Sequence, residues 1–135
     1  MNKRREERMT MQLQLDADRS IYLQIAEQIE DQILRQDLLE DEQVPSTNQM
    51  AALYRINPAT AAKGIALLVD EGILYKQRGI GMFVSAGAQK QILVKRKKDF
   101  FARYVEPMLQ EAKNLSIDPE EINAYIRSRN GAGNS

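Results

Sequence analysis

Two clusters of small and polar side chains stand where the sequence predicts that a helix begins. The first is Ser46-Thr47-Asn48, and the second runs from Asn57 through Pro58, Ala59, Thr60 and Ala62 to Lys63. The first backbone N–H groups of a helix have no partner inside the helix and attract anions. Hydroxyl, amide and ammonium groups at such an end add donors for phosphate oxygens and for the edges of bases. These residues therefore favour recognition of a nucleic acid, without a covalent step.

A third group belongs to a predicted β-hairpin. Gly79-Ile80-Gly81 provides two residues that tolerate positive φ in a tight connection between two short apolar runs. These runs are Ile73-Leu74-Tyr75 and Met82-Phe83-Val84. A hairpin that reaches along a DNA duplex would place Arg78 in the neighbouring minor groove, and Gly79 would let the backbone approach.

The elements that position these groups follow from capping signals. Ser46 and Gln49 have the S-x-x-Q spacing of a capping box. Asn57 is a favoured N-cap, Pro58 suits the first helical position, and Gly72 suits a left-handed C-terminal cap. The order of helix, turn, helix and hairpin predicts a winged helix-turn-helix. The expected fold class is mainly α with a small β-hairpin, followed by two dimerisation helices.

Apolar periodicity divides the chain into four expected parts. They are a flexible tail at 1–10, a winged helix-turn-helix DNA-binding domain at 11–86, a helical dimerisation region at 87–129 and a disordered tail at 130–135. Met11, Leu13 and Leu15 alternate with polar residues, which predicts a short strand. Ser20 is expected to cap the helix that follows.

The carboxyl-terminal region predicts two helices. One runs from about Ala88 and contains Pro107, which should kink or interrupt it. The other starts at Asp118, with Pro119 in its first turn and Glu121 closing a D-x-x-E box. Their apolar stripes would pair two subunits through Phe101, Tyr104, Val105, Met108, Leu109, Ala112, Ile122, Tyr125 and Ile126.

Composition argues against catalysis. The 135 residues include no His and no Cys, so the commonest general base, thiol chemistry and the usual transition-metal ligands are absent. We expect no enzyme activity, no cofactor and no metal. No stretch approaches the roughly 20 apolar residues of a membrane span, and a cytoplasmic location is expected. The formal net charge of zero is weak for a DNA-binding protein, and dimerisation would compensate.

Residues 20–84 resemble the winged-helix domain of GntR-family transcriptional regulators. The matching stretches, in family order and at family spacing, are 20–29, Val44-Pro45-Ser46, 56–60, 67–74 and 79–84. The resemblance implies a homodimer that binds a double-stranded DNA operator with two-fold symmetry. Only residues 85–135 follow this domain, and two helices of that length are similar to the YtrA-type subfamily. That likeness implies helices that pair between subunits, and a repressor of a transporter operon.

Three positions depart from the family pattern. Asn48 stands where many members have an Arg that contacts DNA, so it keeps hydrogen bonding but loses a charge. Lys63 replaces the usual Arg of the recognition helix and lacks its planar fork. Ala61 replaces the usual Val, which makes the core smaller there.

Several features allow other interpretations. The basic run at 95–98 fits a solvated helix face better than a contact with flanking DNA, and Lys3-Arg4-Arg5 fits a plain tail better than a minor-groove arm. Phe100, Phe101 and Tyr104 fit packing better than a small-molecule pocket, Glu120 and Glu121 fit helix capping, and Arg55 is left open between phosphate contact and solvent. The alternative function is a protein-interaction module without sequence-specific DNA binding. The sequence identifies no effector.

Overall fold

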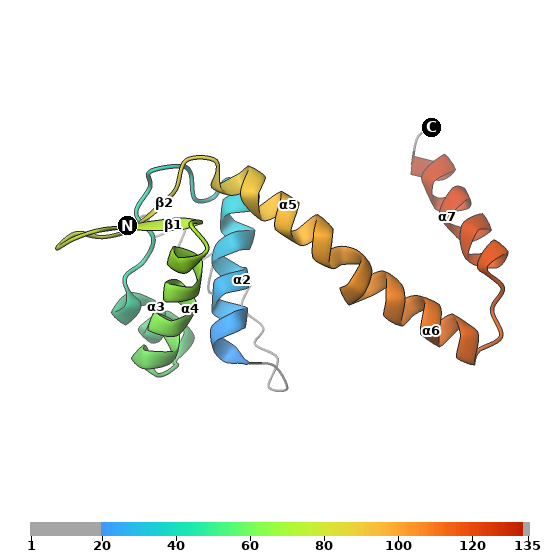
Figure 1. The fold of residues 1–135 in the computed structure, drawn as a ribbon, viewed down its shortest axis with the longest axis horizontal. Helices are drawn as coiled ribbons and strands as arrows, with labels where there is room; N and C mark the ends of the chain where they lie inside the picture. The colour runs from blue at the N-terminus through green and yellow to red at the C-terminus, as the bar shows by residue number, and fades with distance from the viewer. Residues whose placement is uncertain (1–19, 134–135) are drawn as a thin grey trace. The chain divides into compact units, whose positions relative to one another are not determined.

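The computed structural model describes residues 20–133 (Figure 1), so the expected tail at 1–10 and strand at 11–15 lie outside the described residues. The elements are α2 (Ile21–Leu34), α3 (Thr47–Tyr54), α4 (Pro58–Asp70), β1 (Leu74–Gln77), β2 (Gly81–Val84), α5 (Ala88–Phe100), the π-helix η1 (Phe101–Val105), α6 (Glu106–Asn114) and α7 (Pro119–Gly133). The mainly α class with a small antiparallel hairpin is confirmed. The chain divides into two compact units between Leu93 and Val94.

The core of the first unit lies between α2, α3, α4 and the hairpin. The apolar stripe of α2 buries Ile25, Ile29 and Ile33, and α4 buries Ile65 and Leu68 against it. The prediction that Ser20 caps α2 is wrong, because the side chain of Ser20 makes no capping hydrogen bond. The packed stripe, rather than a cap, therefore accounts for this helix.

The hairpin pairs β1 and β2 antiparallel, with Leu74 opposite Val84 and Gln77 opposite Gly81. Its turn closes where Ile80 N donates to Gln77 O at 3.0 Å, and Gly79 takes a φ of 78° inside that turn. A positive φ at this position is what a type II turn requires. Figure 1 shows the hairpin projecting from the helices, with its turn at the free end.

The first unit extends further along the chain than the boundary expected after residue 86. Ala88 and Ile92, one helical turn apart on α5, are both fully buried in the core of this unit. Gln89 Nε2 donates to Leu34 O at 3.1 Å, and Gln91 Nε2 donates to Glu71 O at 2.5 Å. These side chains satisfy carbonyl groups at the ends of α2 and α4 that have no partner within their own helices.

The second unit consists of the remainder of α5 with η1, α6 and α7. Pro107 was expected to kink or interrupt the long helix, and the interruption is the π-helix that ends just before it. Proline cannot donate to the carbonyl four residues earlier, so the regular hydrogen-bond ladder breaks there. Glu106 N donates instead to Phe101 O, the spacing of a π turn.

The capping box of α7 is present. Glu120 N donates to Asp118 Oδ1 at 2.9 Å, and Asp118 N donates to Glu121 Oε1 at 3.3 Å. The helix continues through Gly133, so the tail expected from residue 130 does not begin there. Nucleation is the unfavourable step in helix formation, and it has already occurred once the capped first turn is formed. Each further residue then adds one backbone hydrogen bond, even in a glycine-rich sequence. Within residues 20–133, no helix is long and apolar enough to cross a membrane.

Changing Tyr54 to Phe is expected to stabilise the first unit. Tyr54 is 5% exposed, and its hydroxyl finds no hydrogen-bond partner within residues 20–133. Removing an unsatisfied buried hydroxyl should add about 1 kcal/mol to the free energy of unfolding at pH 7. Urea unfolding of both chains measures this difference, and a variant less stable than the parent would contradict it.

The same substitution should alter the response to alkali. Burial raises the pKa of Tyr54 from 10.0 to about 12. The unfolded chain therefore loses this proton first, and the stability present below pH 10 declines as the pH rises towards 12. In the Phe variant, unfolding measured between pH 9 and pH 11 should show a shallower decline. An equal decline in both chains would contradict this assignment.

Candidate nucleic-acid interface

The amino terminus of α4 carries the second predicted cluster. Asn57 Oδ1 accepts a hydrogen bond from Ala59 N at 2.8 Å, and Pro58 occupies the first helical turn, as expected. The cap uses the oxygen of the Asn57 side chain, which leaves its amide nitrogen as the group suited to an acceptor on DNA. Asn57, Pro58 and Ala59 are all exposed, so this end of α4 is accessible.

Along α4 the predicted contact residues separate from the core. Ala61 and Ile65 are buried, whereas Ala59 and Lys63 are exposed. Thr60 and Ala62 are half-buried, beside the buried stripe rather than within it. The helix therefore offers small side chains and one cation on its accessible surface.

Lys63 has a neighbour that sequence reasoning missed. Its Nζ lies 4.1 Å from the centroid of the Tyr22 ring, which is the geometry of a cation–π contact. Tyr22 lies in the first turn of α2 and is half-buried. The sequence does show an aromatic residue near the start of the helix that precedes the winged region. It does not show that Lys63 is the residue that contacts this ring. The contact restricts the direction in which the ammonium group extends.

The amino terminus of α3 carries the first cluster, and its capping box is confirmed. Gln49 N donates to Ser46 Oγ at 3.1 Å, and Ser46 N donates to Gln49 Oε1 at 2.9 Å. Thr47 is half-buried and Asn48 is exposed. The turn to α4 places Arg55 in the left-handed region at φ 54° and ψ 49°. Ser46 is thus engaged in the cap, and Asn48 is the accessible side chain of this cluster.

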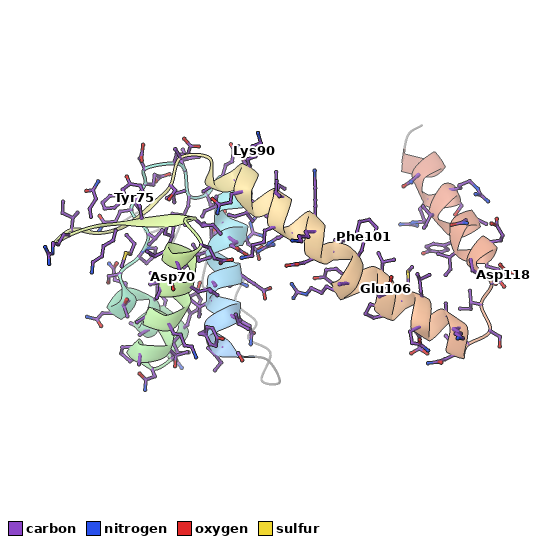
Figure 2. The ribbon with its side chains drawn as sticks, viewed as in Figure 1. Asp70, Tyr75, Lys90, Phe101, Glu106 and Asp118 are labelled. Carbon is purple, nitrogen blue, oxygen red and sulfur yellow. The ribbon has the colours of Figure 1, made fainter. Side chains whose placement is uncertain are left out.

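The hairpin presents Arg78 and Gly79 at its exposed turn, as predicted. Its base is held by a stacked pair, because the rings of Tyr75 and Phe83 lie 5.7 Å apart. Tyr75, labelled on the hairpin in Figure 2, donates through its hydroxyl to Asp41 Oδ1 at 2.9 Å. This hydrogen bond raises the pKa of Tyr75. The base of the hairpin is anchored, and its turn carries the cation.

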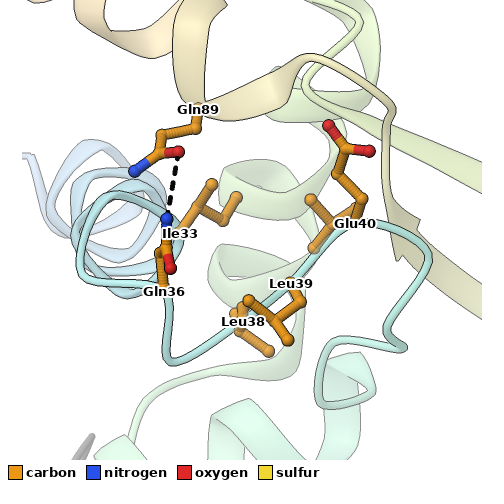
Figure 3. Close-up of a pocket in the computed structure, with 7 residues that line it drawn as sticks. Ile33, Gln36, Leu38, Leu39, Glu40 and Gln89 are labelled. Atoms are coloured by element: carbon orange, nitrogen blue, oxygen red, sulfur yellow. Dashed lines mark hydrogen bonds between the residues drawn. The ribbon is translucent and has the colours of Figure 1, made fainter.

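A small pocket lies beside the start of α5 (Figure 3), and none of the predicted DNA-contact residues lines it. Its volume is about 220 Å³, and its lining includes Leu38, Leu39, Glu40 and Gln89. Leu38 is buried, and Leu39 is 50% exposed. Glu40 Oε1 already accepts from the backbone N–H of Gly87 at 2.7 Å. The pocket is smaller than the ~300 Å³ that small-molecule sites usually reach.

Six of the nine predicted dimerisation residues are exposed on the surface of the second unit. Phe101 is 63% exposed and Tyr125 is 67% exposed, while Val105 and Ile122 are half-buried and Ala112 is buried. Phe100 contacts the Phe101 ring edge-on at 5.4 Å between centroids. The remaining exposed members are Tyr104, Met108, Leu109 and Ile126. A surface of this kind marks an interaction site more often than a solvated face.

Comparison with known proteins gives consistent matches. The profile described as "Bacterial regulatory proteins, gntR family" matches residues 21–84. The uncharacterized HTH-type transcriptional regulator YhcF of Bacillus subtilis is 33% identical over 119 residues, which cover 87% of this chain and 96% of that protein. The HTH-type transcriptional repressor YtrA of the same organism is 27% identical over 107 residues, covering 79% and 82%.

A solved structure agrees with these relatives. The crystal structure of a putative transcriptional regulator of the GntR family from Bacteroides thetaiotaomicron matches with a TM-score of 0.69 and 31% identity. The match covers 84% of this chain and 98% of that one, so it includes the helices that follow the hairpin. The protein described here belongs to the GntR family of bacterial regulatory proteins, whose DNA-binding transcriptional regulators carry this winged helix-turn-helix.

Proposed function

We propose that the protein is a sequence-specific repressor that binds a palindromic operator as a homodimer. The observation that carries this proposal is the accessible amino terminus of α4, where Asn57 and Ala59 are exposed beside Thr60. A major groove admits one α-helix, and a helix-turn-helix inserts the amino terminus of its second helix. Small side chains there allow close approach to base edges.

Each contact residue has a role in this proposal. Thr60 donates to phosphate, Lys63 supplies charge, and Ala59 or Ala62 contacts a thymine methyl group. Thr47 and the first N–H groups of α3 provide a second anion site, with Ser46 holding that helix end in place. Arg78 enters the minor groove beyond the recognition helix. Phosphate contacts would set the register, and contacts at the base edges would select the sequence.

Dimerisation belongs to the same proposal. The exposed surface of the second unit would pair with its counterpart in a second chain through Phe101, Leu109 and Tyr125. Two linked winged helices bind one duplex far more tightly than either alone, because the second contact becomes intramolecular. This gain offsets the zero net charge of the chain.

We also propose that the protein belongs to the YtrA-type subfamily and regulates a transporter operon. The supporting observations are the match to the repressor YtrA over 82% of its length and the short helical region after the hairpin. The neighbouring genes provide a direct check. An adjacent transporter operon supports the assignment, and repeated absence of one in related genomes contradicts it.

Changing Asn57, Thr60 or Lys63 to Ala should weaken operator binding while leaving the fold intact. None of these side chains belongs to the buried core. Loss of a contact to phosphate should weaken binding to all DNA sequences evenly. Loss of a contact to a base should cost about 1–3 kcal/mol of binding free energy and relax the sequence preference at one position. Titrations with operator and scrambled duplexes measure this. Lys90→Ala on α5 is the matched control for Lys63, and unchanged affinity in all three variants would place the recognition surface elsewhere.

Changing Asn48 to Arg should tighten DNA binding. Asn48 is exposed at the start of α3, so an Arg there adds one charge-assisted contact without disturbing the core. The slope of the logarithm of the binding constant against the logarithm of the salt concentration should steepen by the amount expected for about one additional phosphate contact. Titrations at several salt concentrations check both effects. A variant that binds no better at any salt concentration would remove Asn48 from the interface.

A protein-interaction module is the second candidate function. The neutral net charge and the exposed apolar surface of the second unit favour it. Salt separates the two candidates, because DNA binding weakens steeply with added salt and an apolar interface does not.

A further inference from the structure

A short segment beside the hairpin connects it to the start of α3. Val44 N donates to Met82 O at 2.9 Å, and Gln43 lies opposite Phe83 in an antiparallel bridge. Val44 and Pro45 are buried, and Ser46, the N-cap of α3, follows directly. The backbone of this segment is therefore anchored on both sides of Gln43.

The side chain of Gln43 extends along the hairpin to its turn. Gln43 Nε2 donates to Ile80 O at 2.9 Å, a contact across 37 positions of sequence. Ile80 is the last residue of the turn that carries Arg78 and Gly79. The side-chain amide of Gln43 thus connects the hairpin turn to the segment that precedes α3.

Gly81 provides the space for this link. A Cβ added at Gly81 would lie 2.5 Å from Gln43 Nε2 and 3.4 Å from Gln43 Cδ. The φ of Gly81, 150°, is also one that residues with a side chain rarely adopt. The glycine therefore lets the Gln43 side chain lie against the backbone of β2.

The hairpin needs such a link if its turn is to contact DNA. Each strand has four residues, and a short two-stranded hairpin is only marginally stable by itself. The stacked Tyr75 and Phe83 hold its base, but Arg78, Gly79 and Ile80 are exposed. A turn that moves freely must be ordered on binding, and that ordering reduces affinity.

We propose that Gln43 is a positioning residue, which holds the turn of the hairpin at a fixed place relative to the amino terminus of α3. It acts on DNA through Arg78 and makes no contact with DNA itself. The proposal rests on the proposed function, because the position of the turn matters only if Arg78 contacts the operator.

The test replaces Gln43 with Met, which keeps the length of the side chain and removes its hydrogen-bond donor. Gln110→Met, at an exposed position of α6, is the matched control. We expect operator affinity to fall about threefold to tenfold, the range for one ordinary hydrogen bond, while the chain remains folded. Backbone order parameters of Gly79 and Ile80 in the free protein, measured by NMR relaxation, should decrease.

A double-mutant cycle with Arg78→Ala shows whether Gln43 acts through the turn. In the Arg78→Ala chain, Gln43→Met should cause little further loss of affinity. A full additional loss in that background, or unchanged order parameters in Gln43→Met, would overturn the positioning role while leaving the proposed function in place. Failure of the parent chain to prefer its selected operator over scrambled DNA would overturn the proposed function, and the role of Gln43 with it.

Discussion

Changing Leu109 to Asp is expected to separate the subunits and to weaken operator binding by about 100-fold or more. Leu109 lies in α6 on the apolar surface of the second unit and is 40% exposed in the single chain. A carboxylate is solvated there in the monomer but would lose its water at a subunit interface, which costs several kcal/mol. The folded monomer should therefore persist while the dimer does not.

The loss of affinity follows from the geometry of a symmetric site. A single winged helix without net positive charge is expected to bind a half-site weakly, and the linked pair would gain from effective concentration. Val105→Asp should have the same effect, since Val105 is half-buried on the same surface. Gln110→Asp provides the control, because it adds the same charge at the exposed residue next to Leu109.

Sedimentation velocity of the full-length chain and these variants measures the assembly. The parent chain should sediment as a dimer, Leu109→Asp and Val105→Asp as monomers, and Gln110→Asp as a dimer. A parent chain that sediments as a monomer, or an Asp variant that remains dimeric with full affinity, contradicts the proposed interface.

A truncated chain offers an independent check of the same interface. A cut after Gly87 would remove Ala88 and Ile92 from the core of the first unit, so we expect that product to be unstable. A cut after Leu93 keeps both residues and should leave a folded monomer with weak operator binding. Dimerisation by this longer fragment would place the interface in the winged helix.

Changing Gly64 to Leu should destabilise the first unit by about 3 kcal/mol or more. A Cβ at Gly64 would lie 2.7 Å from the carbonyl oxygen of Tyr22 and 3.2 Å from the Ile25 side chain. The carbonyl oxygen belongs to the backbone of α2, so relief requires the two helices to move apart. The core between α2 and α4 would then lose contacts along its whole length.

Ala66→Leu is the matched control, since Ala66 lies two residues further along the same helix and is exposed. Urea unfolding should give a lower free energy for Gly64→Leu and a nearly unchanged value for Ala66→Leu. Operator affinity should also fall in the Gly64 variant, because α4 carries the proposed recognition residues. A Gly64 variant as stable as its control contradicts the close approach of the two helices.

Local signals in the sequence predicted most of the secondary structure. The boxes at Ser46 and Asp118 and the cap at Asn57 involve residues two or three positions apart, so their chemistry can be read without the tertiary fold. The hairpin turn is similarly local. The interruption near Pro107 was predictable because proline lacks a donor, although its π geometry was not.

Contacts between distant segments could not be predicted in the same way. Ile92 lies in a helix of charged residues, and only the fold shows that it belongs to the core of the first unit. The contact of Lys63 with Tyr22 and the link from Gln43 to Ile80 each join separate elements. No periodicity or spacing pattern identifies such pairs, because both partners also have ordinary surface roles.

Selection from a library of random duplexes tests whether the chain recognises a palindromic operator as a dimer. The purified chain is mixed with the library at moderate salt, and the retained duplexes are amplified, selected again and sequenced. We expect enrichment of an inverted repeat with half-sites about one helical turn apart, roughly 34 Å on B-DNA. Enrichment of no sequence, or of a single half-site without symmetry, would contradict recognition of a palindromic operator by a dimer.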